Sequence, residues 1–218
     1  VDPSTVTKIT IQPDSYTGAY DGEPWVADDD GSGDIMVYQN GTELIIAGNG
    51  AEEIYANEDS SNMFMHMSAL ISIEGLNLLN TSKVTDMRYM FNGCSSLTSL
   101  DISNFDMSAI KTTSKDNYFH MFIEIYNVKT LIFGNNKFPD DINFIKLFGD
   151  TQPPSLEKII VLEENTVNKL TDVLPDRSSE LNQGVIVTNA TISDEVISTI
   201  SSKNWSIRKM VAQYRYDA

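Results

Sequence analysis

The stretch that decides the fold reads VTDMRYMFNGCSSLTSLDISNFD and runs from Val84 to Asp106. Its first part carries apolar side chains at positions i, i+3, i+6 and i+7, which is the spacing of one helix face. Its second part, from Leu97 to Ile102, alternates apolar and polar residues, as a half-buried strand does. Gly93 stands between the two parts, where a helix C-terminus favours a left-handed residue. The stretch therefore predicts a short helix followed by a short strand.

Related stretches lie on both sides of this one. A Met-Phe or Leu-Phe pair returns at intervals of about 26 to 31 residues, and each pair is followed by an apolar triplet spaced L-x-x-L-x-L. One such unit cannot bury its apolar face alone, so stacked copies have to share a core. The pairs are Met63-Phe64, Met90-Phe91, Met121-Phe122 and Leu147-Phe148. The triplets are Leu97/Leu100/Ile102, Val128/Leu131/Phe133 and Leu156/Ile159/Val161, with a partial copy at Leu70/Ile73 in which Gly75 replaces the third apolar residue.

The predicted fold class is α/β, a right-handed leucine-rich-repeat solenoid with a short helix and a strand in each repeat and one mostly parallel sheet. Residues 84–106 resemble the repeat of the BspA-like leucine-rich-repeat surface proteins of bacteria, and the resemblance extends more weakly over residues 60–162. It implies a surface-exposed protein that adheres to host, matrix or glycan ligands. It implies no catalytic residues.

The two ends of the chain predict caps for this array. Residues 6–12 alternate like a strand, and Asn40-Gly41 between two apolar runs predicts a β-hairpin. Near the other end we expect a helix around Val167 to Leu174, a strand at residues 185–187, a helix starting at Ser193 and a closing strand at Trp205. The predicted division is an N-terminal β-rich cap over 1–50, repeats over 51–162, and a degenerate repeat with a C-terminal cap over 163–218, all in one continuous domain.

Composition narrows the classes of partner. Fifteen Lys and Arg oppose 31 Asp and Glu, giving a formal charge of −16 that repels nucleic acid. The single cysteine excludes an internal disulfide, and no apolar run is long enough to span a membrane. The chain opens with Val1-Asp2-Pro3 and has no signal-peptide pattern. We expect that a signal peptide has been removed and that the protein is extracellular or on the cell surface.

The candidate ligand-facing residues are those that point away from the core at the x positions of the strands. They form two columns, in which the second changes from acidic to apolar. An apolar patch at Ile132 and Ile160 is one expectation, and cover by the C-terminal cap or a helix is the alternative. The first column is Ser72, Ser99, Thr130 and Lys158, and the second is Glu74, Asp101, Ile132 and Ile160.

Three features raise the question of metal or catalysis. The loop Asp28–Asp34 could wrap calcium, although it lacks the closing Glu of an EF-hand and also fits a solvated acidic loop. His66 and His120 fall at different phases of the repeat, which disfavours a shared metal site. Cys94 follows the predicted helix end, where a buried structural thiol is favoured over a nucleophile. We therefore expect no catalytic residue, no metal and no cofactor.

The sequence favours a non-catalytic binding or adhesion module with an unknown protein or glycan ligand. A structural spacer that displays another domain is the alternative. A hydrolase would need two converging carboxylates, and no feature of the sequence nominates such a pair.

Overall fold

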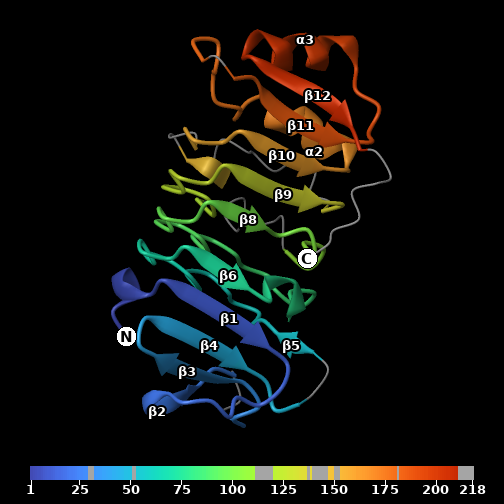
Figure 1. Ribbon diagram of the computed structural model, residues 1–218. Helices are drawn as coiled ribbons and strands as arrows, with labels where there is room; N and C mark the ends of the chain where they lie inside the picture. The colour runs from blue at the N-terminus through green and yellow to red at the C-terminus, as the bar shows by residue number, and fades with distance from the viewer. Residues whose placement is uncertain are drawn as a thin grey trace.

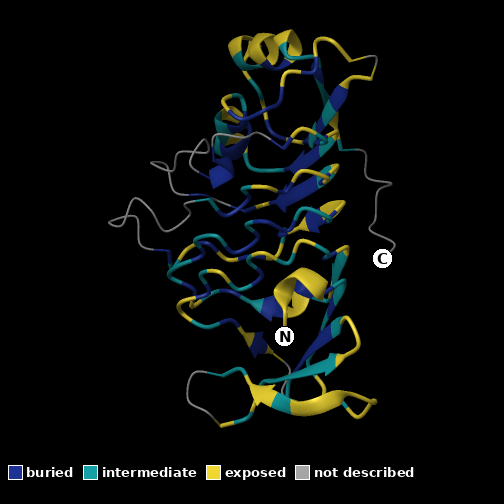
Figure 2. Ribbon diagram, turned by 90° about the vertical axis from the view of Figure 1, so that its left-hand side faces the viewer, coloured by how far each residue is buried: buried dark blue, intermediate teal, exposed yellow. Residues whose placement is uncertain are grey.

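The computed structural model describes residues 1–28, 32–50, 53–110, 120–136, 138, 147–149, 153–180 and 182–210. Its strands lie one above another along the long axis of the molecule (Figure 1). They form two five-stranded sheets and one two-stranded sheet. Turned by 90°, the strands lie along one side of the molecule and irregular turns form the opposite side (Figure 2).

The N-terminal sheet is mixed, and its central strand is the first in the chain. Strand β1 pairs in parallel with both β4 and β6, whereas β2, β3 and β4 pair antiparallel. The hairpin predicted around Asn40-Gly41 is confirmed, because β3 and β4 join there and Gly41 has a φ of +59°. In spatial order the strands are β2 (Asp21–Val26), β3 (Met36–Asn40), β4 (Glu43–Ala47), β1 (Lys8–Gln12) and β6 (Ser72–Glu74).

The C-terminal sheet is parallel throughout. In spatial order its strands are β12 (Trp205–Lys209), β11 (Gly184–Thr188), β10 (Lys158–Val161), β9 (Thr130–Gly134) and β8 (Ser99–Asp101). The remaining elements are β5 (Ile54–Tyr55), β7 (Leu79–Asn80), the 3-10 turns η1 (Pro3–Thr5) and η2 (Leu76–Leu78), and the helices α2 (Glu164–Leu170) and α3 (Asp194–Ser202).

The expected leucine-rich-repeat solenoid, with a helix in every repeat and one mostly parallel sheet, is wrong. Within the described part of residues 53–136 the stretches opposite the strands are turns and contain no α-helix. The strands also fall into two separate five-stranded sheets. The protein is a mixed α/β structure, and two of its α-helices, α2 and α3, lie near its C-terminal end.

Left-handed residues explain why the predicted helices do not form. Tyr89 and Gly93 flank Met90-Phe91 with φ of +57° and +77°, and a right-handed helix cannot pass through such residues. Positive φ recurs at the equivalent positions around the neighbouring pairs, at Asn62 and His66 and at His120 and Glu124. The apolar spacing that resembles a helix face is instead produced by a chain of turns.

Each turn contains i to i−3 bonds of its own, such as Asn92 N–H to the Tyr89 carbonyl at 3.0 Å, and successive turns are also bonded to one another. The Phe64 N–H donates to the Met90 carbonyl at 2.9 Å, and the Phe91 N–H donates to the Met121 carbonyl at 3.0 Å. The Phe122 N–H continues the series to Leu147 at 3.0 Å. Bonds between successive turns therefore replace the i to i−4 bonds of a helix and satisfy the buried backbone.

The repeated phenylalanines form a continuous column in the core. Ring centroids lie 5.4 Å apart for Phe64–Phe91, 6.1 Å for Phe91–Phe122 and 5.3 Å for Phe122–Phe148, which is the range of favourable aromatic contact. All four side chains are buried. The recurring apolar residues of the stretch 84–106 lie in this core, with Met90, Phe91, Leu97, Leu100 and Ile102 at most 2% exposed.

At the C-terminal end, the strands predicted at residues 185–187 and at Trp205 are confirmed, whereas the helix expected around Val167 to Leu174 lies earlier, at Glu164–Leu170. The Ser193 side chain accepts from the Val196 N–H and caps α3, as predicted. Trp205 on β12 is fully buried, and its indole N–H donates to the Pro175 carbonyl at 2.9 Å. A Cβ on Gly184 of β11 would lie 2.4 Å from the Trp205 ring, so this glycine makes room for the tryptophan. The end of the C-terminal sheet is thereby filled.

Candidate functional site

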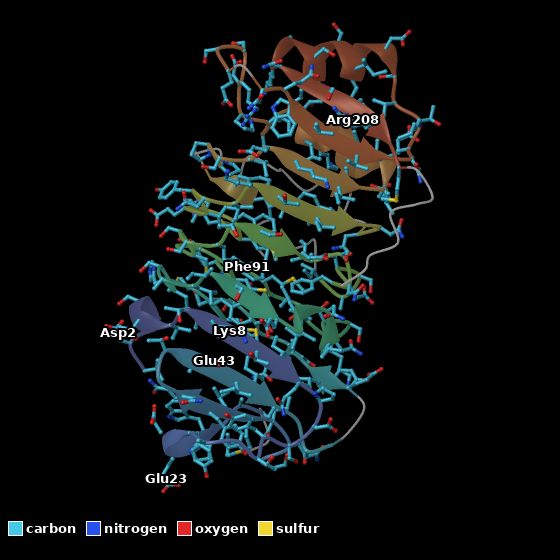
Figure 3. The ribbon with its side chains drawn as sticks, viewed as in Figure 1. Asp2, Lys8, Glu23, Glu43, Phe91 and Arg208 are labelled. Atoms are coloured by element: carbon cyan, nitrogen blue, oxygen red, sulfur yellow. The ribbon has the colours of Figure 1, made fainter. Side chains whose placement is uncertain are left out.

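Six of the eight candidate residues form two rows on the outer face of the C-terminal sheet. Ser99, Thr130 and Lys158 occupy paired positions on β8, β9 and β10, and so do Asp101, Ile132 and Ile160. The register continues these rows into β11 and β12, where the second row ends at Arg208 (Figure 3).

Ser72 and Glu74 do not join these rows by backbone pairing. They lie on β6, in the N-terminal sheet, where they pair with Lys8 and Thr10 of β1. The eight residues therefore divide between two sheets. No sequence pattern indicated that β1, from the start of the chain, pairs with the strand of the first repeat.

The rows differ in how much they expose. Ser99 and Asp101 on the edge strand β8 are exposed, whereas Ile132 and Ile160 are only 9% exposed. These two isoleucines are flanked in their row by Asp101 on one side and by Val187 and Arg208 on the other. Ile132 and Ile160 therefore expose little apolar surface. The accessible candidate residues of the C-terminal sheet, Ser99 and Asp101, lie on its edge strand β8.

A groove of about 500 Å³ lies where the two sheets meet. Strands β6 and β8 are the facing edges of their sheets and are not hydrogen-bonded to each other as strands. Side chains bridge the two repeats on either side of the gap: Ser96 Oγ donates to the Ser68 carbonyl at 2.6 Å, and Asn104 Nδ2 donates to the Asn77 carbonyl at 3.3 Å.

The lining of the groove combines apolar and hydrogen-bonding groups. Ile73, Leu76 and Leu100 supply the apolar part, and Leu100 is 2% exposed. Polar groups come from Ser99, Asp101, Ser103, Asn77 and Asn104. Asn77 and Asn104 were not among the predicted site residues, although each stands seven positions after the first leucine of its triplet, so their common phase was a usable signal.

The charges beside the groove on the N-terminal sheet are paired. Lys8 Nζ lies 2.9 Å from Glu74 Oε2 and 3.3 Å from Glu43 Oε1 (Figure 3). The contact with Glu74 is the main reason that the pKa of Lys8 is raised. The hydroxyl of Thr10 donates to Glu43 at 2.6 Å and is the main reason that the pKa of Glu43 is lowered. On the groove wall, the Ser103 N–H donates to Asp101 Oδ1 at 2.9 Å.

The residues considered for metal or catalysis are dispersed. His66 lies two positions after Phe64, whereas His120 lies two positions before Phe122, so the two histidines occupy different places in their turns. Both have positive φ. Cys94 is fully buried, and burial raises the pKa of its thiol to about 12. Such a thiol is not an activated nucleophile. Within the described residues no three His, Cys, Asp or Glu side chains are grouped to hold a metal ion.

Part of the acidic loop at Asp28–Asp34 lies outside the described residues, namely residues 29–31. At its two ends, Asp28 Oδ2 accepts from the Ile35 N–H at 2.9 Å and Asp34 Oδ1 accepts from Asn49 Nδ2 at 2.7 Å. These contacts join the loop to the β3–β4 hairpin.

Across the segments that the structure describes, no helix has the length and apolar character required to cross a membrane.

One family model matches the chain, over residues 55–136, and is described as DUF285, Mycoplasma protein of unknown function. No curated protein and no solved structure matches. The matched segment begins in β5, ends just after β9 and contains the whole groove between β6 and β8.

Proposed function

We propose that this protein is a non-catalytic binding module displayed on the outside of a bacterial cell, and that it holds a protein or glycan ligand in the groove between β6 and β8. The observation that carries the proposal is the groove itself. At about 500 Å³ it has the size of a specific site. It also collects two exposed candidate residues, Ser99 and Asp101, at one sheet edge.

The chemistry of the groove favours a ligand rich in hydrogen-bonding groups. Amides from Asn77 and Asn104, hydroxyls from Ser99 and Ser103, and one carboxylate from Asp101 surround an apolar part. Amides and hydroxyls both donate and accept, so they can match peptide groups or sugar hydroxyls. A net charge of −16 disfavours polyanionic ligands and favours neutral or basic ones.

Two observations support display rather than catalysis. Ser99, Asp101 and Asn104, which line one side of the groove, belong to the stretch of residues 84–106 that resembles bacterial surface proteins. The polar groups of the groove include one carboxylate, and acid–base chemistry on a glycosidic bond uses a pair.

The test is binding of the purified protein to glycan and protein arrays, compared with two variants. Ser99→Tyr places a bulky side chain in the groove. Ser206→Tyr is the matched control, because Ser206 occupies the same row of the same sheet on β12, at the opposite edge. We expect ligands that the wild type and Ser206→Tyr retain and Ser99→Tyr loses. An array without ligands, or ligands that Ser99→Tyr retains, contradicts the proposal, and the first result favours a structural spacer.

A further inference from the structure

The N-terminal end of the core contains a cavity. It has a volume of about 330 Å³ and lies against the inner face of the N-terminal sheet. Val37 of β3 and Leu44 and Ile46 of β4 line one side, while Met63 and Phe64 of the first Met-Phe pair line the other.

The cavity exists because the sheet continues farther than the turns that cover it. Phe64 is the first member of the phenylalanine column, and the turn that contains it is hydrogen-bonded to the turn that contains Met90 and Phe91. Strands β4 and β3 lie beyond β1 in the sheet, and they are joined to each other by a tight turn at Gly41. A tight hairpin adds strands without adding a covering turn, so their apolar inner faces meet a hollow.

The lining suits an apolar ligand of modest size. Volumes of about 300 to 1,000 Å³ with mostly apolar walls and a few polar groups are usual for small-molecule sites. Met63 and Met67 are only partly buried and lie on the wall. Methionine side chains are flexible and polarisable, so such a wall adapts to the shape of an apolar group.

A second hollow of about 560 Å³ adjoins the first, and the two share Ile35, Tyr55, Ala56 and Asn57. Its lining is acidic where that of the first is apolar. Among the described residues, the ionisable side chains that line it are the carboxylates of Asp28, Asp34, Glu53 and Glu58 and the ammonium of Lys83. An apolar compartment beside an acidic one matches a molecule with an apolar body and a cationic end.

The structure already holds one ammonium group in the acidic hollow. Lys83 Nζ lies 4.4 Å from the centre of the Tyr55 ring, which is the geometry of a cation–π contact. The Tyr55 hydroxyl is bonded to Glu53, and this bond is the main reason that the pKa of Glu53 is lowered. Asn80 Nδ2 also donates to Glu53 at 2.9 Å. A carboxylate and an aromatic face are therefore fixed side by side.

We propose that the two hollows together bind a small amphipathic amine, with its apolar body in the 330 Å³ cavity and its ammonium among the carboxylates of the acidic hollow. The site is separate from the groove between β6 and β8, with which it shares no lining residue. It does not depend on the function proposed for that groove.

The test compares two fluorescent probes that share an apolar body and differ in end charge. Dansylcadaverine carries a primary amine, and 6-(dansylamino)hexanoic acid carries a carboxylate on a chain of similar length. We expect the amine to bind with a blue-shifted, enhanced emission and the acid to bind at least about tenfold more weakly, since like charge opposes it. Equal affinity of the two probes, or no binding of the amine, overturns the proposal.

Variants locate the binding. Ala27→Leu and Val37→Phe each add volume at a half-buried position that lines the apolar cavity, and both should abolish binding of the amine. Ala69→Leu is the matched control, because Ala69 is also half-buried but lines neither hollow. A melting temperature is measured for each variant, so that a fold defect in one filling variant leaves the other to decide. Retained binding in a folded filling variant overturns the proposal.

Charge variants test the second compartment. Glu58→Gln with Glu53→Gln should reduce the preference for the amine over the acid toward unity, while the groove variant Ser99→Tyr should leave amine binding unchanged. A preference that persists without these two carboxylates contradicts the assignment of the ammonium. If Ser99→Tyr removed amine binding, the probe would lie in the groove and the proposed pair of hollows would be wrong.

Discussion

The C-terminal and N-terminal sheets bury their inner faces in different ways. Behind the C-terminal sheet, the side chains of Phe91 and Trp205 are both 0% exposed. Behind the N-terminal sheet, Leu44 and Ile46 face a cavity of about 330 Å³ and remain 9% and 8% exposed.

The difference follows from how each strand is connected. In the parallel sheet every strand is reached by a crossing segment, and that segment supplies apolar side chains to cover the strand. The antiparallel strands β3 and β4 are joined by a tight turn at Gly41, so this hairpin extends the sheet without extending its cover. Parallel connection therefore produces a filled core here, and antiparallel connection produces a hollow that can hold a ligand.

The largest expected effect is on the filled side. Phe91 is buried and contacts the rings of Phe64, Phe105 and Phe122. Phe91→Ala should lower the free energy of unfolding by about 3–5 kcal/mol, the usual cost of a large-to-small aromatic change in a core. Urea unfolding followed by circular dichroism measures it. Tyr126→Ala, at a side chain that is 41% exposed, is the control and should change little. A loss below about 1 kcal/mol for Phe91→Ala would mean that the column does not hold the core together.

The same substitution at the two ends tests the comparison directly. Leu100→Ala, on β8, should cost about 2–5 kcal/mol because it opens a new cavity in a packed region. Leu44→Ala, on β4, enlarges a hollow that already exists, and it should cost about 2 kcal/mol or less. The free energy of unfolding of each variant is measured by urea titration under the same conditions. Equal losses would show that the N-terminal cavity is closed in solution.

The repeat in the sequence predicted the core better than it predicted the local structure. The Met-Phe pairs and the L-x-x-L-x-L triplets identified mostly buried residues, with Met63 and Ile73 only partly buried, because any stacked architecture has to bury the same recurring side chains. The same periodicity could not distinguish a helix face from a series of turns. Glycine at position 93 signalled one left-handed residue, but Tyr89 and Glu124 adopt positive φ without any such signal in their residue type.

One feature of the sequence, Gly75, marks the boundary between the two sheets, but its meaning is clear only in the structure. Gly75 replaces the third apolar residue of the first triplet, and in the structure it has a φ of +74° and directly follows β6. A Cβ at this position would lie 2.1 Å from the Ile11 carbonyl oxygen. The chain therefore turns close against β1, and β6 ends after three residues. The groove could not be predicted, because the pairing of β1 with β6 depends on contacts between distant parts of the chain.

Two glycines provide a comparison of intermediate size. Gly93→Ala places a Cβ in a left-handed backbone, which costs about 1–2 kcal/mol, and the nearest atom is the His66 side chain at 3.0 Å. Gly75→Ala carries the same backbone cost and meets a backbone carbonyl at 2.1 Å, which cannot move without shifting β1. We expect Gly75→Ala to be the more destabilising of the two in thermal unfolding. The opposite order would mean that the junction at β6 is more pliable than the turn column.

The smallest effect concerns the surface charges of the two sheets. Lys8 contacts Glu74 and Glu43 at 2.9 and 3.3 Å, whereas Lys129 in the C-terminal region contacts only Glu157 among the described acidic side chains, at 3.3 Å. Exposed ion pairs contribute about 0.2–1 kcal/mol, and a lysine shared by two carboxylates belongs in the upper part of that range. Lys8→Met should therefore destabilise the protein slightly more than Lys129→Met in urea titrations at low salt.

The pKa of Lys8 is raised in the folded protein, which fixes the sign of the pH dependence. Its stabilising contribution is complete at neutral pH and disappears as the pH rises into the range where lysine side chains lose their proton. The difference between wild type and Lys8→Met should accordingly shrink at high pH, and it should also shrink in about 1 M salt, where exposed charges are screened. A difference that persists under both conditions would show that the Lys8 alkyl chain, and not its charge, stabilises the outer face of the N-terminal sheet.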